Sequence, residues 1–453
     1  MAREDIDVMG PIETGIAGMV IMFVMIALRV PIALAMALVG AGGTVVLSGE
    51  TILLRQLQTL AFDQFSLYDL SVVPFFILMG QFAGRSGLSG DLFAGVNAWI
   101  GRLRGGVAMA AIGACAGFGA VCGSSLATAS TMGQVALPEL RRLGYAPALA
   151  TGTLAAGGTL GILIPPSVVL VIYAVTVESN IVTMFGAALV PGLIAVVFFL
   201  AVIRIQVLLK PELGPAATPV PWPEKLRLTL RLAPVVLVFG VVIGGIYMGL
   251  FNPTPAAAVG ALLVGLYGIG LRLAGRGGLG PAGLKAAMLE TALSTAMIYL
   301  ILFGAALLQI FLARSGLPQA GAALVRESTL DPYLILVAIL VLLILLGCLM
   351  DSLSMILLAI PFLWPVVAGL DFGLTPEDQK VWFGIIALVV VELGLITPPV
   401  GLNVFIINGL AHDVPMRETF RGVMPFFAAE ILRVALLVAV PAITLTLPRL
   451  LGY

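Results

Sequence analysis

The sequence contains little charge, almost no histidine and few cysteines. Only 10% of its 453 residues are charged, and the net charge is zero. The single histidine, His412, excludes a histidine-rich metal centre, and Cys115, Cys122 and Cys348 lie in apolar segments, where we interpret them as small buried residues. No basic tract is present, so the composition gives no sign of nucleic-acid binding.

Catalytic sequence motifs are absent as well. The chain has no HExxH, Walker, GxSxG or Cys–His pattern, so its motifs do not predict an enzyme. Without a phosphate-binding loop the chain cannot hydrolyse ATP by itself. We therefore expect any transport to be driven by an ion gradient.

Apolar residues, in contrast, make up 60% of the chain, and the mean hydropathy is +1.15. Apolar runs recur along the whole length at roughly 18 or more residues, which is enough to cross a hydrocarbon core of about 30 Å. These runs lack the alternating pattern of barrel strands. We predict an all-α polytopic membrane protein. Residues 1–14 are acidic and unlike a cleavable signal peptide, so we expect them to form a short N-terminal extension.

The apolar segments fall into two halves on either side of a proline-rich linker. We predict membrane segments at 15–28, 31–48, 70–84, 183–209, 231–250, 255–275, 286–312 and 422–447, and an interfacial amphipathic helix at 51–66. Two-armed re-entrant hairpins are predicted at 105–140 and 333–367, and broken helices at 148–175 and 381–410. The first repeat then covers 15–209, the cytoplasmic linker 210–230, and the second repeat with scaffold helices 231–453.

Each half contains one helix that is interrupted by a short run beginning with glycine and ending in two prolines. The runs are GILIPP at 161–166 and GLITPP at 394–399. A helix broken at mid-membrane exposes carbonyls and helix ends that can bind an ion or an anion. Such backbone persists only where protein buries it or a cavity adjoins it. The two breaks are the strongest signal in the sequence for a transporter binding site.

The two halves share further residues in the same order. RSGL occurs at 85–88 and 314–317, and the hairpin centres SSL at 124–126 and DSL at 351–353 correspond, as do Pro138 and Pro365. The first hairpin is flanked by Arg102, Arg104, Arg141 and Arg142, which places its base in the cytoplasm. The second is flanked mainly by acidic residues, and counting the spans between them places it outside. We predict inverted repeats whose hairpins enter from opposite faces.

Polar side chains gather at the centres of both hairpins. Ser124, Ser125 and Thr128 offer oxygens that suit a hard cation or can hydrogen-bond an anion, although close helix packing by small residues is an alternative. Asp351 lies between leucine-rich arms, where an ionised carboxylate costs about 3 kcal/mol or more. It could hold a cation, balance a cationic partner or accept a proton, and a structural salt bridge is the alternative. Glu392 could ligate directly or hydrogen-bond to a ligating residue.

Backbone oxygens are expected at the breaks too. Proline removes a donor and leaves upstream carbonyls free, so Gly161, Gly394 and their neighbours can offer them. Kinks that serve packing alone are the alternative. Three polar residues accompany the breaks: Ser167, Thr397 and Asn403.

Arg85 and Arg314 end apolar segments in the two halves. One interpretation is that they are interfacial anchors whose charged ends reach water. The other is recognition of an anion by the paired N–H groups of a guanidinium.

Two long stretches of the chain resemble the large membrane subunit of tripartite ATP-independent periplasmic (TRAP) transporters. They are LATGTLAAGGTLGILIPPSVVLVIYAVTVESNIVTMFGAALV at 149–190 and ELGLITPPVGLN at 392–403. The resemblance covers nearly the whole chain. One departure is Pro255, which stands where relatives often carry glutamate after Pro-Thr. Because proline suits the first turn of a helix, we expect little functional consequence.

The resemblance implies a sodium-coupled transporter of the elevator type, in which the hairpins and broken helices move as one body against a scaffold. Its expected location is the bacterial or archaeal cytoplasmic membrane, and its expected cargo is a small organic acid. Its implied partners are a small four-helix membrane subunit and a periplasmic substrate-binding protein. The chain is too short to include the small subunit, so a separate polypeptide should supply it. No cofactor is expected beyond the transported Na⁺.

The resemblance also implies positions for the ligands. The first sodium site would include Ser124, Ser125, Thr128, Gly161, Leu163 and Pro165, and the second Asp351, Ser352, Ser354, Gly394, Thr397 and Pro398. Substrate would lie within reach of Ser125, Ser167, Arg314, Asp351 and Asn403. Sodium coupling also has independent physical support, because a carboxylate entering beside Asp351 would be repelled unless cations came with it.

Three other functions compete with this interpretation. A self-sufficient sodium:anion symporter could share the hairpins and broken helices. An intramembrane aspartyl enzyme would need a second carboxylate beside Asp351, and Glu392 is the candidate in that half. A channel is disfavoured because mirrored re-entrant tips allow occlusion rather than one continuous pore.

Overall fold

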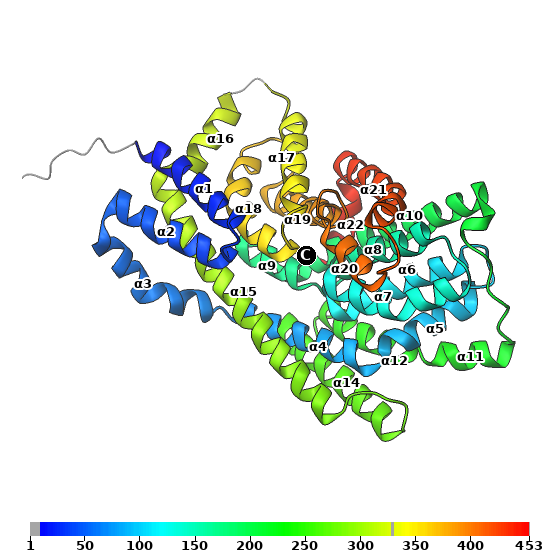
Figure 1. Cartoon of the computed structure of the whole chain (residues 1–453). Coiled ribbons are helices and arrows are strands. Elements are labelled where there is room, and N and C mark those ends of the chain that lie inside the picture. Colours follow the sequence, from blue (N-terminus) through cyan, green and yellow to red (C-terminus); the bar gives the residue numbers. More distant parts are fainter. Residues whose placement is uncertain (1–9, 328–329, 453) are drawn as a thin grey trace, which may run out of the picture.

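The computed structural model describes residues 10–327 and 330–452, and their regular secondary structure is helical (Figure 1). Residues 1–9 of the predicted N-terminal extension lie outside the described range. The chain starts with α1 (Pro11–Ala27), α2 (Ile32–Ser48), α3 (Glu50–Phe65), η1 (Tyr68–Ser71), α4 (Val72–Ser86) and α5 (Leu88–Ile100). Helix α3 has no buried residue and bends by 53° from the helical segment after it, which fits the predicted interfacial helix.

Both predicted hairpins consist of two helices with a short tip between them. The first is α6 (Gly106–Cys122) with α7 (Ser125–Arg142), and the second is α17 (Pro332–Gly347) with α18 (Ser352–Val367). The broken helices follow them, as α8 (Pro147–Leu163) with α9 (Val168–Thr176) and α19 (Pro376–Gly394) with α20 (Leu402–Leu410). The first pair bends by 48° at its break. Both proline pairs contain a cis peptide bond.

The remaining helices connect and surround these elements. They are α10 (Ile181–Leu209), η2 (Pro211–Leu213), α11 (Trp222–Leu230), α12 (Ala233–Phe239), the π-turn η3 (Gly240–Gly244), α13 (Gly245–Tyr247), α14 (Pro253–Leu273), α15 (Pro281–Ser315), α16 (Leu317–Glu327), α21 (Met416–Ala439) and α22 (Ala442–Leu450).

Helices α5 and α16 were not predicted, and two further differences from the predicted segments involve proline. The helical span Trp222–Tyr247 starts inside the predicted linker, because Pro223 is tolerated in a first helical turn, where its missing N–H has no partner in any case. The last predicted membrane segment is divided into α21 and α22, and Pro441 lies between them. Proline cannot donate the backbone hydrogen bond that would continue α21.

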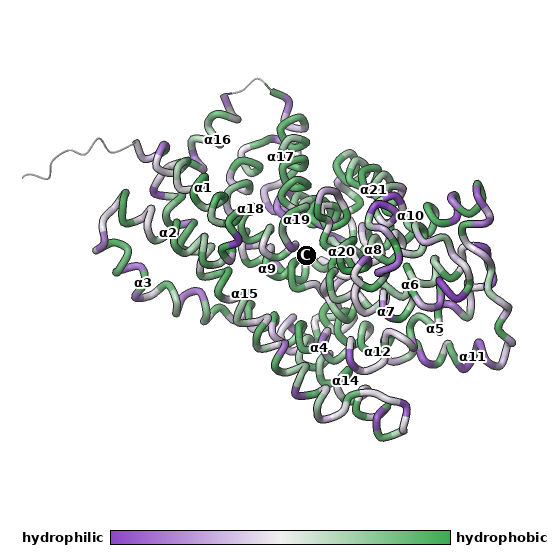
Figure 2. Tube along the Cα trace, viewed as in Figure 1, coloured by the Kyte–Doolittle hydropathy of each residue, from purple (hydrophilic) through white to green (hydrophobic). Residues whose placement is uncertain are grey.

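The described helices include five that are long and apolar enough to cross a membrane, or seven if each bent pair is counted as one span. Apolar residues colour most of the trace, and the hydrophilic ones concentrate in connecting loops and helix ends (Figure 2). Large apolar side chains also point outward, among them Leu193, Val197 and Ile205 of α10. Lipid can cover such a surface at no hydrophobic cost.

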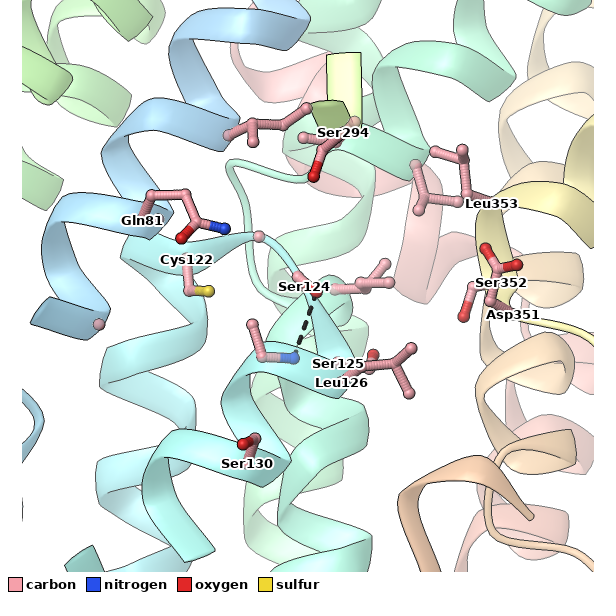
Figure 3. A pocket seen from close by; sticks show the side chains of 18 of the residues that line it. Gln81, Cys122, Ser124, Ser125, Leu126, Ser130, Ser294, Asp351, Ser352 and Leu353 are labelled. Carbon is pink, nitrogen blue, oxygen red and sulfur yellow. Dashed lines mark hydrogen bonds between the residues drawn. The ribbon is translucent and has the colours of Figure 1, made fainter. Parts of the chain in front are cut away.

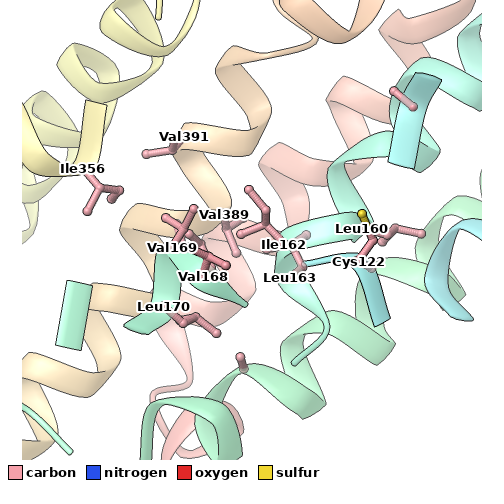
Figure 4. Close-up of a cluster of buried hydrophobic side chains, with 14 of the residues drawn as sticks. Cys122, Leu160, Ile162, Leu163, Val168, Val169, Leu170, Ile356, Val389 and Val391 are labelled. Atoms are coloured by element: carbon pink, nitrogen blue, oxygen red, sulfur yellow. The ribbon is translucent and has the colours of Figure 1, made fainter. Parts of the chain in front are cut away.

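The first segments of the two broken helices form the centre of the protein. Every residue from Leu149 to Leu163 in α8 is buried, and so is every residue from Val381 to Gly394 in α19. A helix that is buried on all sides needs apolar residues around its whole circumference. Figure 4 shows the apolar cluster around the first break, where Ile162 and Val169 lie near Val389 and Val391 of α19.

The two halves interlock in a crossed arrangement. Helix α9 of the first half packs on α18 of the second hairpin, and α20 of the second half packs on α7 of the first hairpin. In the same manner α8 packs on α21, and α19 packs on α10. Two repeats related by a two-fold axis produce this pairing.

A second group of helices packs beside this body. Helix α15 contacts α2 and α4, and α14 contacts α4 (Figure 1). The approach of α2 to α15 is close, because a Cβ added at Gly40 would lie 2.5 Å from the backbone carbon of Leu307. We call α2, α4, α14 and α15 the scaffold helices.

Candidate functional site

The tip of the first hairpin consists of a sharp turn and a helix start. Helix α6 ends at Gly123, whose φ of +64° is a left-handed conformation that glycine adopts without strain. Helix α7 begins with Ser124 as its N-cap, and the Ser124 hydroxyl accepts a hydrogen bond from the N–H of Ala127 at 3.4 Å (Figure 3). This turn leaves Ser124 and Ser125 at the end of the hairpin.

The tip of the second hairpin has the same construction with a charged cap. Asp351 is the N-cap of α18, and its carboxylate accepts from the N–H of Ser354 at 3.2 Å and from the Ser354 hydroxyl at 2.6 Å. The partial positive charge of a helix N-terminus favours a carboxylate in this position. Asp351 therefore occupies the place that Ser124 has in the first hairpin.

The first tip is held closely against the first break. A Cβ added at Gly161 would lie 2.5 Å from both the carbonyl oxygen of Ser124 and the hydroxyl oxygen of Thr128. The Thr128 hydroxyl is buried beside the Cys122 thiol and has no oxygen or nitrogen partner among the described residues. Glycine at 161 brings these oxygens next to the last turn of α8.

The second tip contacts the second break in a similar way. A Cβ added at Gly394 would lie 2.6 Å from backbone atoms of Gly347, at the end of α17. The Cys348 thiol donates a hydrogen bond to the carbonyl of Pro398 at 3.4 Å. Each hairpin tip therefore rests on the break of its own repeat.

A cavity of about 360 Å³ separates the tips from the scaffold helices α4 and α15 (Figure 3). Its polar lining comes from Gln81, Arg85, Ser124, Ser125, Ser130, Thr131, Ser294, Asp351 and Ser352. The two charged residues in the lining are Arg85 and Asp351, and Arg85 donates to the side-chain oxygen of Gln81 at 2.5 Å. This is a size suited to a small ligand, with few polar groups that converge on it.

Behind the tips, one carboxylate contacts both hairpins. Glu392 of α19 is 1% exposed and accepts hydrogen bonds from the hydroxyls of Ser125 and Ser352, the latter at 2.5 Å. The two serines bind different oxygens of the carboxylate. Glu392 is therefore a junction between the two repeats.

A buried ion pair lies near this junction. Glu430 and Arg433 on α21 pair with each other, and both are close enough to act electrostatically on Glu392. Arg433 also donates to the carbonyl of Pro191 on α10 at 3.1 Å. Pairing and hydrogen bonding are what permit charges at this depth.

The predicted sodium ligands divide into two groups. Around the first tip the structure brings together Ser124, Ser125, Thr128 and Gly161, and around the second Asp351, Ser352, Ser354 and Gly394. Leu163 and Pro165 are buried near the first break. The Thr397 hydroxyl instead donates to the carbonyl of Leu393 at 2.6 Å, and Pro398 is exposed.

Of the predicted substrate residues, only Ser125 and Asp351 line the cavity. Ser167 is buried as the N-cap of α9, and Asn403 donates to the carbonyl of Ala155 on α8 at 3.3 Å. Arg314 lies at the exposed end of α15 and donates to the hydroxyl of Ser48 at 3.2 Å. Its counterpart in the first repeat, Arg85, is the arginine that lines the cavity.

Four polar lining residues were not predicted as ligands: Gln81, Ser130, Thr131 and Ser294. Arg85 was considered for anion recognition, but Arg314 alone was included among the predicted substrate residues. Gln81 and Arg85 are four residues apart in an apolar helix, so they share one face. This spacing indicates that the two side chains can contribute to one site. Ser130 and Thr131 carry no such signal, because hydroxyl residues are common in tightly packed membrane helices.

The chemistry of the tips favours a hard cation and an anion over a transition metal. Among the described residues no group of three His, Cys, Asp or Glu side chains could hold a metal ion. Hydroxyl, carboxylate and backbone carbonyl oxygens are the ligands that hard cations prefer. The guanidinium of Arg85 can pair with a carboxylate.

Comparisons with known proteins agree with these features. The family model described as "Tripartite ATP-independent periplasmic transporter, DctM component" matches residues 19–443. The C4-dicarboxylate TRAP transporter large permease protein DctM of Pseudomonas aeruginosa is 34% identical over 398 residues, covering 88% of this chain and 90% of that one. The sialic acid TRAP transporter large permease protein SiaM of Vibrio cholerae is 32% identical over 388 residues, covering 85% and 88%.

Two solved structures have a similar fold. The YdaH transporter of Alcanivorax borkumensis superposes with a TM-score of 0.63 at 18% identity, covering 86% of this chain and 89% of that one. MtrF of Neisseria gonorrhoeae has a TM-score of 0.57 at 16% identity, covering 85% and 84%. At these identities the likeness shows the fold alone.

Proposed function

This chain belongs to the DctM component family of tripartite ATP-independent periplasmic transporters, and on that premise we propose that it imports a small organic acid together with sodium ions. It is a multi-pass protein of the inner membrane, and its relatives are permeases rather than enzymes. The observation that carries the proposal is the meeting of two mirrored hairpin tips at one cavity that holds one arginine and one aspartate.

Sodium would bind where each tip rests on its break. At the first tip the oxygens of Ser124 and Thr128 surround Gly161, and the Thr128 hydroxyl has no oxygen or nitrogen partner within the described chain. At the second, the carboxylate of Asp351 supplies a full negative charge next to Ser354. Because a cation there neutralises Asp351, it lowers the cost of an organic anion in the same cavity.

The substrate would lie in the cavity between Arg85 and the tips. A guanidinium can give a carboxylate two parallel hydrogen bonds, which are stronger and more directional than those of a neutral donor. The hydroxyls of Ser124 and Ser130 on the opposite wall can donate to further oxygens. Since the relatives are named for substrates as different as C4-dicarboxylates and sialic acid, we propose the class of small organic acids rather than one compound.

We propose that the cavity faces the cytoplasm, and the ion pairs near its arginine support this orientation. Asp91 on α5 pairs with Arg231 at 3.1 Å and with Arg276 at 3.6 Å. Arg231 follows α11 directly after the predicted cytoplasmic linker, Arg276 lies between α14 and α15, and such a cluster of arginines favours the cytoplasmic side. Arg85 lies at the end of α4, immediately before α5. The arginine end of the cavity would therefore lie towards the cytoplasmic side, as in a carrier that is releasing its cargo.

Two partner proteins complete the proposed system. We propose a small membrane subunit and a periplasmic binding protein that delivers the substrate. The isethionate TRAP transporter permease protein DctMQ of Oleidesulfovibrio alaskensis matches 91% of this chain, while this chain covers only 63% of that longer protein.

Reconstitution of the chain with its small subunit into proteoliposomes tests the proposal. We expect uptake of the organic acid only when an inward sodium gradient and the loaded binding protein are both present. Equal uptake without a binding protein would instead favour a self-sufficient sodium:anion symporter. Steady single-channel currents through the reconstituted protein would favour a channel.

A further inference from the structure

Glu392 is the one carboxylate among the described residues that accepts hydrogen bonds from both hairpins. Ser125 is the first residue of α7 and Ser352 is the first residue of α18, so the two donors hold equivalent positions in the two repeats. Glu392 itself does not line the cavity. Its contacts are therefore with the residues that form the site.

The backbone of α19 around Glu392 is closely packed. It lies two residues before Gly394, in a stretch of α19 that is buried on all sides, and Gly394 packs directly on the backbone of Gly347. The charges facing it come from α21, where Glu430 and Arg433 pair with each other. A carboxylate fixed in this way has little freedom to follow a tip that moves.

Each serine is joined through the backbone to a cavity residue. Ser125 follows Ser124, and Ser352 follows Asp351. A displacement of Ser124 or Asp351 therefore also moves the serine next to it. This movement changes the hydrogen bond between that serine and Glu392. A buried carboxylate that loses a hydrogen-bond donor destabilises the folded protein. A change at one tip therefore alters the hydrogen bonding of Glu392 to the other tip.

From this arrangement we propose that Glu392 is a positioning residue that holds the two hairpin tips at one spacing. It acts through Ser125 and Ser352. Where the proposed sodium sites exist, this junction couples them, so that a cation at one tip orders the other. The coupling of cation sites rests on the proposed function, while the positioning of the tips does not.

Hydrogen exchange of the two tips, measured by mass spectrometry on the full-length protein with its small subunit, tests the proposal without requiring transport. The informative peptides cover residues 120–130 and 347–356, and the first measurement is made without sodium. We expect Glu392→Ala to speed exchange in both peptides by about tenfold, as expected from the loss of a hydrogen bond to a charged group. In Ser352→Ala the peptide 120–130 should also exchange faster, although the substitution lies in the other hairpin.

Gln379→Ala is the matched control. Gln379 is also buried on α19, and its side chain donates to the carbonyls of Val367 and Leu370 at the base of the second hairpin, at 2.7 and 3.2 Å. Its removal should affect peptides of the second hairpin and leave residues 120–130 unchanged. If Glu392→Ala does not insert, Ser125→Ala and Ser352→Ala carry the test, each read at the opposite tip.

A change confined to the tip that carries the substitution would overturn the proposal. A second measurement is made with sodium present. It distinguishes failure of the positioning role of Glu392 from failure of the proposed sodium coupling. In the wild type, sodium should slow exchange at both tips, and in Ser352→Ala the protection of residues 120–130 should weaken. If sodium protects neither tip of the wild type while Ser352→Ala still loosens the first, the positioning role stands and sodium coupling fails.

Discussion

The first arm of each hairpin has different surroundings, because α6 lies within the protein whereas α17 lies at its edge (Figure 1). Nearly all of α6 is buried, but α17 buries one side only and exposes large apolar residues such as Leu334, Val341 and Leu345. The breaks follow the same rule, because Pro165 and Pro166 are buried while Pro398 and Pro399 are exposed. Two repeats with one sequence plan thus differ in the burial of one hairpin arm and of the proline pair, while the caps Ser124 and Asp351 are both half-buried.

The tips also differ in charge. The first is capped by the neutral hydroxyl of Ser124 and the second by the carboxylate of Asp351. A charged cap needs a counterion or hydrogen-bond donors, and a neutral hydroxyl cap does not need a counterion. We infer that the carboxylate of the second tip contributes more to the attraction of a cation than the hydroxyl of the first tip does.

The largest effect is expected from removing the charge that distinguishes the tips. Asp351→Ala should abolish sodium-driven uptake while the protein still inserts, because it removes the carboxylate and the cap of α18 together. Uptake into proteoliposomes and the yield in the membrane fraction measure the two properties. Asp371→Ala is the control, since Asp371 is an exposed acid of the same half that accepts from the N–H of Gly373. Normal transport by Asp351→Ala would refute the second cation site.

A methyl group at each break tests the difference in burial. Gly161→Ala places a Cβ 2.5 Å from Ser124, at the tip that follows the buried arm α6, and Gly394→Ala places one 2.6 Å from Gly347 at the end of α17, an arm with one free side. We expect Gly161→Ala to cost more stability, within the range of about 1–3 kcal/mol for an overpacked core. Thermal unfolding of the purified protein measures this. Gly42→Ala, where nothing lies within 4 Å of the added Cβ, is the control.

Equal losses of thermal stability at Gly161 and Gly394 would show that the different burial of α6 and α17 does not affect how tightly the two breaks are packed. A larger loss at Gly394 would reverse the expected order.

The smallest effect concerns Arg85 and Arg314, which hold equivalent positions in the two repeats. Arg85→Ala should raise the half-saturating substrate concentration about tenfold, since it removes a charged donor from the cavity. Arg314→Ala removes an exposed contact with Ser48 and should change the same quantity less than about twofold. Saturation curves of uptake compare the two variants. A stronger effect at Arg314 would place the substrate on the other side of the scaffold.

Much of the fold could be predicted because glycine and proline mark its irregular points. The hairpin arms and both breaks fall within a few residues of the predicted positions, since Gly123, Pro165 and Pro398 interrupt otherwise continuous apolar runs. The start of a helix at Trp222 was missed because a proline-rich sequence can be a linker or a first helical turn.

The site was less predictable, because the repeats have similar sequences but unequal surroundings. RSGL occurs in both halves, and only the packing of α4 beside the first tip decides that Arg85 rather than Arg314 lines the cavity. Glu392 was recognisable as a carboxylate in an apolar run. Its contact with both hairpins could not be predicted, because it depends on the crossing of the two repeats in space.

Radioactive sodium entry and organic-acid uptake, measured in the same proteoliposomes with the loaded binding protein, provide the most direct test of sodium-coupled import at these two tips. We expect the organic acid to stimulate sodium entry in the wild type and not in Asp351→Ala. Uptake of the acid that continues unchanged when potassium replaces sodium on both sides of the membrane would contradict it.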